Sequence, residues 1–116
     1  IRDFSNFMQT GVPWLSAEPL LGPIDLIGGI MNVFGELDFF DREILKKFFG
    51  WVVVGAESGP NRRPCKLEWV RLIVEQCKIA NIPVFVKQLD INGNLVKDIE
   101  KFPEDLQIRQ IPWRRR

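Results

Sequence analysis

The side chains best suited to chemistry stand directly after three apolar runs of this 116-residue chain: Glu18, Glu57, Ser58, Lys87 and Gln88. A carboxylate such as Glu18 or Glu57 can hold an ammonium group or ribose hydroxyls, and burial beside a second carboxylate raises its pKa. The ammonium of Lys87 can neutralise a glutamate or bind a substrate carboxylate. Ser58 and Gln88 can recognise polar groups without charge. These residue types indicate a binding site for a polar ligand, but they identify no catalytic residue.

The three runs are predicted strands of one parallel sheet. In chain order, strands over residues 13–18, 51–55 and 83–88 alternate with helices over residues 1–9, from 38 or 41 to 49, and 66–81. Alternation without hairpins implies parallel strands joined by crossover connections. Because the carboxyl ends of parallel strands meet at one edge, we expect Glu18, Glu57 and Lys87 to lie close enough to share one ligand or one ion pair. The alternative is that strand ends turn polar simply because the chain reaches water there.

Two valine-rich segments make this fold prediction specific. Residues 52–54 and 84–86 are expected to be buried parallel strands, either neighbours or one strand apart, because continuous β-branched runs are typical of strands covered on both faces. Beyond residue 88 the pattern changes, and Asn92-Gly93 between two short apolar segments predicts a hairpin. The alternating residues 106–111 predict a further strand. The chain therefore divides into a βα core over residues 1–88 and a hairpin and tail over residues 89–116.

Composition excludes several classes of site. The chain has no histidine, which removes Ser-His, Cys-His and His-metal centres. Cys65 and Cys77 cannot supply the four thiolates of an ordinary iron–sulfur cluster, so we expect the chain to bind neither a cluster nor zinc. The formal charge of +1 falls to −2 without Arg114, Arg115 and Arg116, unlike the basic balance of most nucleic-acid readers. Neither a membrane span nor a signal sequence is indicated, which predicts a cytoplasmic protein.

Five blocks of sequence occur in a recognisable order: S-A-E-P-L-L-G-P-I-D-L (16–26), G-A-E-S-G-P (55–60) with Arg63-Pro64, W-V-R (69–71) with Gln76-Cys77, P-V-F-V-K-Q (83–88) and F-P-E-D-L-Q-I-R (102–109). Together they resemble a phage-associated, radical-SAM-like family of uncharacterised proteins. The resemblance implies an α/β fold in which parallel βα units form part of a TIM-like, radical-SAM-type barrel. Ala56 stands where the family often has glycine, and the segment over residues 28–40 is longer than usual.

The resemblance covers the C-terminal half of such proteins. Family members carry an N-terminal Cys-rich motif of the kind that binds a [4Fe–4S] cluster and S-adenosylmethionine, and this chain lacks that motif. It is therefore interpreted as a C-terminal half-barrel fragment of a longer phage or prophage protein, or as a single domain, and the cluster and S-adenosylmethionine are assigned to the parent protein. A half-barrel exposes two sheet edges, which favours pairing with the missing N-terminal half or with another copy of the chain.

Three functions remain open at this point. The leading interpretation is a half-barrel that is inactive alone and contributes strand-end contacts to substrate or S-adenosylmethionine. The second is a non-enzymatic phage module that binds nucleic acid or a partner protein, through Arg62, Arg63, Arg109 and the terminal residues Arg114–Arg116. The third is a folded remnant with no separate activity. Whether the chain is part of an enzyme stays undecided by its residues.

Overall fold

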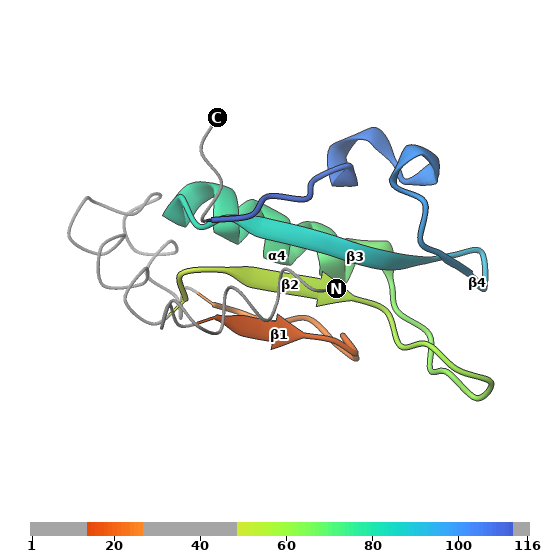
Figure 1. Cartoon of the computed structure of the whole chain (residues 1–116). Helices are drawn as coiled ribbons and strands as arrows, with labels where there is room; N and C mark the ends of the chain where they lie inside the picture. Colours follow the sequence, from red (N-terminus) through yellow and green to blue (C-terminus); the bar gives the residue numbers. More distant parts are fainter. Residues whose placement is uncertain (1–13, 27–48, 113–116) are drawn as a thin grey trace.

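The computed structural model describes residues 14–26 and 49–112 (Figure 1). Four strands form one sheet in the order β1 (Leu15–Ala17), β2 (Val52–Gly55), β3 (Val84–Ile91) and β4 (Asn94–Val96). The first three strands are parallel, and β4 runs antiparallel to β3. The helices predicted over residues 1–9 and from 38 or 41 lie outside the described residues. No helix within the described residues is long and apolar enough to cross a membrane.

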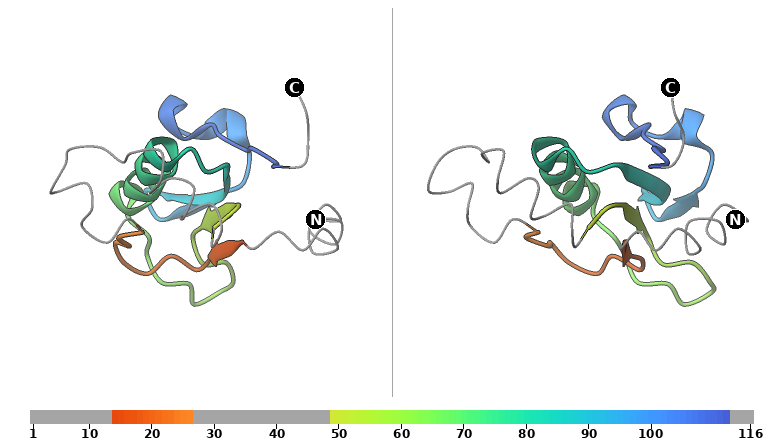
Figure 2. Two further views of the ribbon diagram at one scale, coloured as in Figure 1. Left: turned by 90° about the vertical axis from the view of Figure 1, so that its left-hand side faces the viewer. Right: turned by 60° about the vertical axis from the view of Figure 1, so that its left-hand side comes forward.

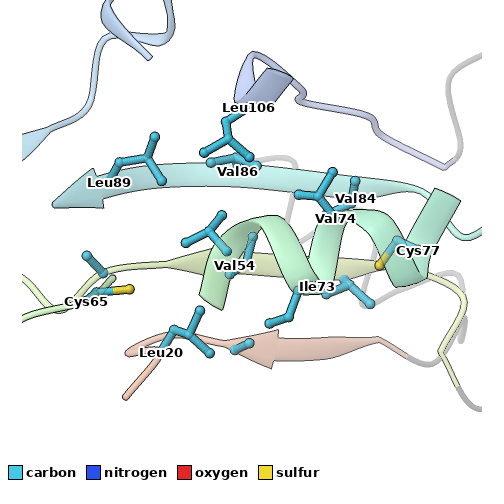
Figure 3. Packing of buried hydrophobic residues seen from close by; sticks show 14 of the residues in the cluster. Leu20, Val54, Cys65, Ile73, Val74, Cys77, Val84, Val86, Leu89 and Leu106 are labelled. Carbon is cyan, nitrogen blue, oxygen red and sulfur yellow. The ribbon is translucent and has the colours of Figure 1, made fainter. Parts of the chain in front are cut away.

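Helix α4 (Leu67–Ala80) connects β2 to β3 and covers one face of the sheet (Figure 2). The predicted apolar stripe is confirmed, because Val70, Ile73, Val74 and Cys77 are all buried. Figure 3 shows the side chains of this stripe packed beside the valines of β2 and β3. The helix begins after Lys66 and ends at Asn81, whose φ of 59° is the left-handed conformation that terminates many helices.

The two valine segments are adjacent parallel strands, as predicted. Val52 pairs with Val84 and Val54 pairs with Val86, and all four side chains are buried. The opposite face of the sheet is also covered, since Trp51 and Val53 are buried together with partly buried aromatic neighbours. The ring centroids of Trp14 and Trp51 lie 5.7 Å apart. Burial on both faces explains why this strand carries no alternation of polar residues.

The fold is therefore mixed α/β with a mostly parallel sheet, and the described residues do not show a closed barrel. The hairpin prediction is confirmed at the Asn92-Gly93 turn, where both residues have positive φ. Its first strand is not separate, however: β3 runs without interruption to Ile91, so the boundary drawn at residue 88 falls inside a strand. The strand predicted over residues 106–111 is reduced to one bridge between Arg109 and Phe85, because η2 (Glu104–Leu106) occupies its start. Another short 3-10 helix, η1 (Ile99–Lys101), precedes it.

On one side of the sheet the chain itself pairs with the outer edge of β3. Beyond the stretch that pairs with β4, the outer edge of β3 exchanges hydrogen bonds with residues 108–110: Val86 N–H donates to Ile108 O and Gln110 N–H donates to Val84 O, both at 2.9 Å. On the other side, β1 is the outermost strand among the described residues. The described sheet therefore ends in β1 on one side and in β4 with residues 108–110 on the other.

Gln76 anchors the segment that follows β1 to the helix. Its side-chain oxygen accepts a hydrogen bond from Leu26 N–H at 2.5 Å, and its amide donates to Ile24 O at 2.7 Å and Leu72 O at 3.1 Å. The side chain is buried, with 7% of the residue exposed. Replacing it leaves buried backbone groups without partners, which costs about 1–3 kcal/mol for each such group.

We expect Gln76→Ala to lower the free energy of unfolding by about 2 kcal/mol. Urea denaturation followed by tryptophan fluorescence measures this change. The matched control is Glu75→Ala, the preceding and exposed residue of α4, for which the change stays within about 0.5 kcal/mol. Equal midpoints for the two variants would show that residues 24–26 are held by apolar packing alone.

Candidate functional site

Glu18, Lys87 and Gln88 meet where the parallel part of the sheet ends: Glu18 follows β1, and Gln88 of β3 pairs with Gly55, the last residue of β2. The ammonium of Lys87 lies 3.1 Å from Oε1 of Glu18, and Nε2 of Gln88 donates to Oε2 of the same carboxylate at 3.1 Å. Nε2 of Gln88 also donates to the backbone oxygen of Ala56 at 2.6 Å. One carboxylate is thus held by a cation and an amide that come from two consecutive residues. We call these three side chains the rim cluster.

A β-bulge in β3 allows consecutive residues to reach the same partner. Val54 pairs with Val86 but Gly55 pairs with Gln88, so Lys87 is an extra residue opposite β2. Successive side chains of a regular strand point to opposite faces, whereas a bulge redirects one of them. A Cβ at Gly55 would lie 3.5 Å from Cβ of Lys87 and 3.4 Å from Cγ of Gln88. Both side chains therefore lie next to Gly55, on the same face of the sheet.

The rim cluster lies on the face of the sheet opposite α4. The side chain of Val54 belongs to the core beneath the helix, so by alternation residue 55 faces the other way. Continued by one residue beyond each end of β1, the same alternation places Glu18 with Trp14, which packs in the second cluster around Trp51. In parallel α/β sheets ligands bind beyond the carboxyl ends of the strands. The cluster occupies that position.

Glu57 does not join the rim cluster but pairs with Arg63 in its own loop. Its Oε1 accepts hydrogen bonds from the backbone N–H of Arg63 at 2.9 Å and from Nε at 2.8 Å, and its Oε2 accepts from Nη2 at 2.8 Å. The reason is positional: β2 ends at Gly55, so Glu57 has left the sheet and takes a partner six residues away. Ser58 is exposed and forms no hydrogen bond with any residue in 14–26 or 49–112.

The pairing with Arg63 gives Glu57 a distinct acid titration. Hydrogen bonds from the Arg63 side chain, followed by that from its backbone, lower the pKa of Glu57 to about 2. A depressed folded-state pKa contributes stability above the unfolded value of 4.5, and this contribution is lost as the pH falls from there towards 2. We expect NMR titration of the Glu57 carboxyl carbon to give a midpoint near 2 and Arg63→Gln to return it to the ordinary range. An unchanged midpoint in that variant would contradict the assignment.

Asp90 is a structural carboxylate that the sequence patterns did not single out. Its oxygens accept hydrogen bonds from the backbone N–H of Cys65 and of Gly93, both at 3.1 Å, and its side chain is only 8% exposed. Arg62 lies 3.5 Å from Asp90 and also donates to Gly93 O. These contacts fasten the loop after β2 to the hairpin. The one available signal was an aspartate two residues before the turn, a position that favours side-chain-to-backbone bonds.

Arg109 serves the sheet in a similar way. Its guanidinium donates to the backbone oxygens of Val86 and Lys87 at 2.9 Å and of Lys97 at 2.7 Å. The guanidinium carbon lies 5.4 Å from the ring centroids of both Phe85 and Phe102. Three arginines of the nucleic-acid interpretation (Arg62, Arg63 and Arg109) are therefore engaged in contacts within the chain, and Arg114–Arg116 lie outside the described residues.

The cysteines do not fit a metal or cluster site. Both are free and buried. Burial raises the pKa of Cys65 to about 11, with a smaller effect of the nearby Asp90 carboxylate, and burial raises the pKa of Cys77 to about 12. Both thiols therefore hold their protons at neutral pH. Within residues 14–26 and 49–112 no three potential ligand side chains come together.

A cavity of about 820 Å³ lies at the other end of the sheet. It opens between the C-terminal end of α4 and the tail, beside Ile82, Val84 and Gln110. Because Val84 begins β3, the cavity is at the amino-terminal end of that strand and is separate from the rim cluster. Among residues 14–26 and 49–112, no carboxylate lines it.

Comparison with known proteins finds one family. A family model described as "Protein of unknown function (DUF5131)" matches residues 3–105. The matched range contains the whole described sheet and all three residues of the rim cluster. No curated protein and no solved structure matches the chain.

Proposed function

We propose that this chain, which belongs to the DUF5131 family, forms the C-terminal part of a partial βα barrel in a phage or prophage protein of the radical-SAM type. In this proposal the rim cluster binds the carboxylate of a substrate or of S-adenosylmethionine. The observation that carries it is the convergence of Glu18, Lys87 and Gln88 on one face, at the end of the parallel part of the sheet, where β1 and β2 finish. Barrels of parallel βα units bind their ligands at this edge.

Lys87 is the group of the cluster best placed to hold an anion. An ammonium has three donors, and the contact with Glu18 uses one of them. The Lys87 side chain is 37% exposed and that of Glu18 is 22% exposed, so both are accessible from solvent. Lys87 contacts one carboxylate oxygen of Glu18 and Gln88 contacts the other, so together they orient this carboxylate. A ligand carboxylate then binds Lys87, and an ammonium or hydroxyl group of the ligand binds Glu18.

S-adenosylmethionine fits this pair because, when bound, it supplies a carboxylate and an ammonium on one carbon. A substrate that carries a carboxylate fits Lys87 equally well. In this proposal the iron–sulfur chemistry belongs to a different part of the parent protein, because the two cysteines of this chain cannot supply the four thiolates of an ordinary cluster. The chain by itself is inactive and provides ligand contacts.

Two titrations of the full-length protein test the proposal, one with S-adenosylmethionine and one with acetate. Backbone amide signals of Glu18, Lys87 and Gln88 are expected to shift in both. Affinity for S-adenosylmethionine at least about tenfold above that for acetate, equal to about 1.4 kcal/mol, identifies the cofactor as the source of the carboxylate. Similar affinities identify a substrate carboxylate. If neither compound moves these signals, the proposal is wrong.

Variants separate ligand binding from structural support. Glu18→Gln and Lys87→Met are expected to abolish the shifts while changing the free energy of unfolding by less than about 1 kcal/mol, because the ion pair is partly exposed. Lys101→Met is the matched control, since Lys101 is exposed and lies on η1. Lower stability with unchanged affinity in Lys87→Met would make the ion pair structural.

A further inference from the structure

The orientation of the Gln88 amide is determined by its two partners. Its NH2 group donates to Oε2 of Glu18 at 3.1 Å and to the backbone oxygen of Ala56 at 2.6 Å. Both partners are oxygens, and neither an ionised carboxylate nor a carbonyl can donate. Exchanging the positions of nitrogen and oxygen in the amide would therefore replace two hydrogen bonds by two repulsive contacts. The nitrogen is thus assigned by the network.

This assignment leaves the side-chain oxygen of Gln88 without a donor. Only 2% of Gln88 is exposed, yet Oε1 accepts no hydrogen bond from any residue in 14–26 or 49–112. Buried polar atoms in folded proteins are almost always partnered, and an exception calls for a water molecule, an ion or a ligand. An amide oxygen accepts hydrogen bonds, so its missing partner carries an N–H or O–H group.

The unpartnered oxygen belongs to the same cluster as the exposed ammonium. Lys87 and the Gln88 amide contact different oxygens of one carboxylate, each at 3.1 Å, and both side chains lie next to Gly55. An anion-binding group and a free acceptor are therefore neighbours. A ligand that satisfies both must carry a donor close to its carboxylate.

We infer that Oε1 of Gln88 accepts a hydrogen bond from a hydroxyl or amino group of the ligand, so that the site selects hydroxy- or amino-carboxylates over plain carboxylates. The inference rests on the proposed function and adds a specificity-determining residue to it. A site that contains an unpaired acceptor discriminates against an analogue lacking the donor, because that acceptor stays unpaired in the complex.

Glycolate and acetate are the probes, because they share a carboxylate and differ by one hydroxyl group. In NMR titrations of the full-length protein, glycolate is expected to bind about fivefold more tightly than acetate, the gain of one neutral hydrogen bond. Glycolate, but not acetate, is also expected to shift the side-chain carbonyl carbon signal of Gln88. The Gln88 carbonyl shift is measured on the unsubstituted protein, so it tests the inference even if a Gln88 variant does not fold.

Gln88→Met removes the acceptor at similar side-chain length, and it should equalise the two affinities. The control is Gln107→Met, whose amide binds Phe102 O away from the rim cluster at 3.0 Å, and it should keep the preference. If the unsubstituted protein binds glycolate and acetate with equal affinity, and the Lys87 signal shifts with both, the inference is wrong and the proposed function is unaffected. No binding of either anion overturns the inference, and it overturns the proposed function as well when S-adenosylmethionine also fails to shift these signals. A preference that survives Gln88→Met assigns the donor contact to another atom and also overturns the inference.

Discussion

Arg109→Ala is expected to lower the free energy of unfolding by about 3 kcal/mol, because it leaves several backbone carbonyls without donors. The guanidinium of Arg109 binds the oxygens of Val86, Lys87 and Lys97 and so joins β3 to the segment after β4. Its guanidinium carbon also lies 5.4 Å from the ring centroids of both Phe85 and Phe102, where cation–π contacts add to the loss. Urea denaturation of parent and variant gives the difference.

Two further variants separate charge from geometry at this position. Arg109→Lys is expected to recover little of the loss, because an ammonium cannot present the planar fork of a guanidinium or stack on aromatic rings. The matched control is Arg71→Ala, whose surface ion pair with Asp105 has side chains 43% and 52% exposed and should contribute less than about 1 kcal/mol. If Arg109→Ala is as stable as Arg71→Ala, Arg109 is not required for the fold, and this would favour its role as a nucleic-acid contact.

Val54→Asp is expected to abolish folding at 25 °C. Val54 is fully buried at 0% exposure, between its paired strands and under α4, and no cation lies in that core cluster. An unpaired carboxylate there costs several kcal/mol, a large share of the roughly 5–15 kcal/mol that stabilises a typical domain. Circular dichroism should show loss of the helical signal, and the amide spectrum should lose its dispersion.

Graded substitutions make the effect of Val54 quantitative. Val54→Ala removes two methyl groups and is expected to cost about 2 kcal/mol, which urea denaturation can measure in a folded protein. Asn94→Asp introduces the same carboxylate at an exposed position of β4 and should change stability by less than about 0.5 kcal/mol. A folded Val54→Asp protein with the midpoint of Asn94→Asp would contradict the observed core.

The regular elements were readable from local patterns. The spacing of Val70, Ile73, Val74 and Cys77 predicted α4 because a helix repeats every 3.6 residues whatever surrounds it. The continuous apolar runs of β2 and β3 predicted strands buried on both faces. Asn92-Gly93 predicted the turn through the positive φ that both residues tolerate. Each of these signals depends on neighbours within a few residues. The extension of β3 to Ile91 was missed because a bulged strand looks like two shorter strands in sequence.

Local sequence patterns did not predict which carboxylates join the rim cluster. Chain polarity predicted that Glu18 and Lys87 would meet, and they do so at 3.1 Å. Glu57 stands equally close to a strand end in the sequence, yet Arg63 in the same loop holds both of its oxygens. Which of two carboxylates stays at the rim depends on how the loop after β2 closes. That closure also uses contacts of Arg62 with the hairpin, which are remote in sequence.

The sequence by itself determined helix α4, the hairpin turn, the parallel direction of the first three strands and the residue types available at their ends. Periodicity and chain direction are properties of the covalent chain, so they need no knowledge of distant contacts. Only the tertiary structure decided that Lys87 and Gln88 face the same carboxylate, because the bulge arises from register against β2. It also decided that Oε1 of Gln88 lacks a donor, since hydrogen-bond satisfaction depends on every atom that packs around a buried amide.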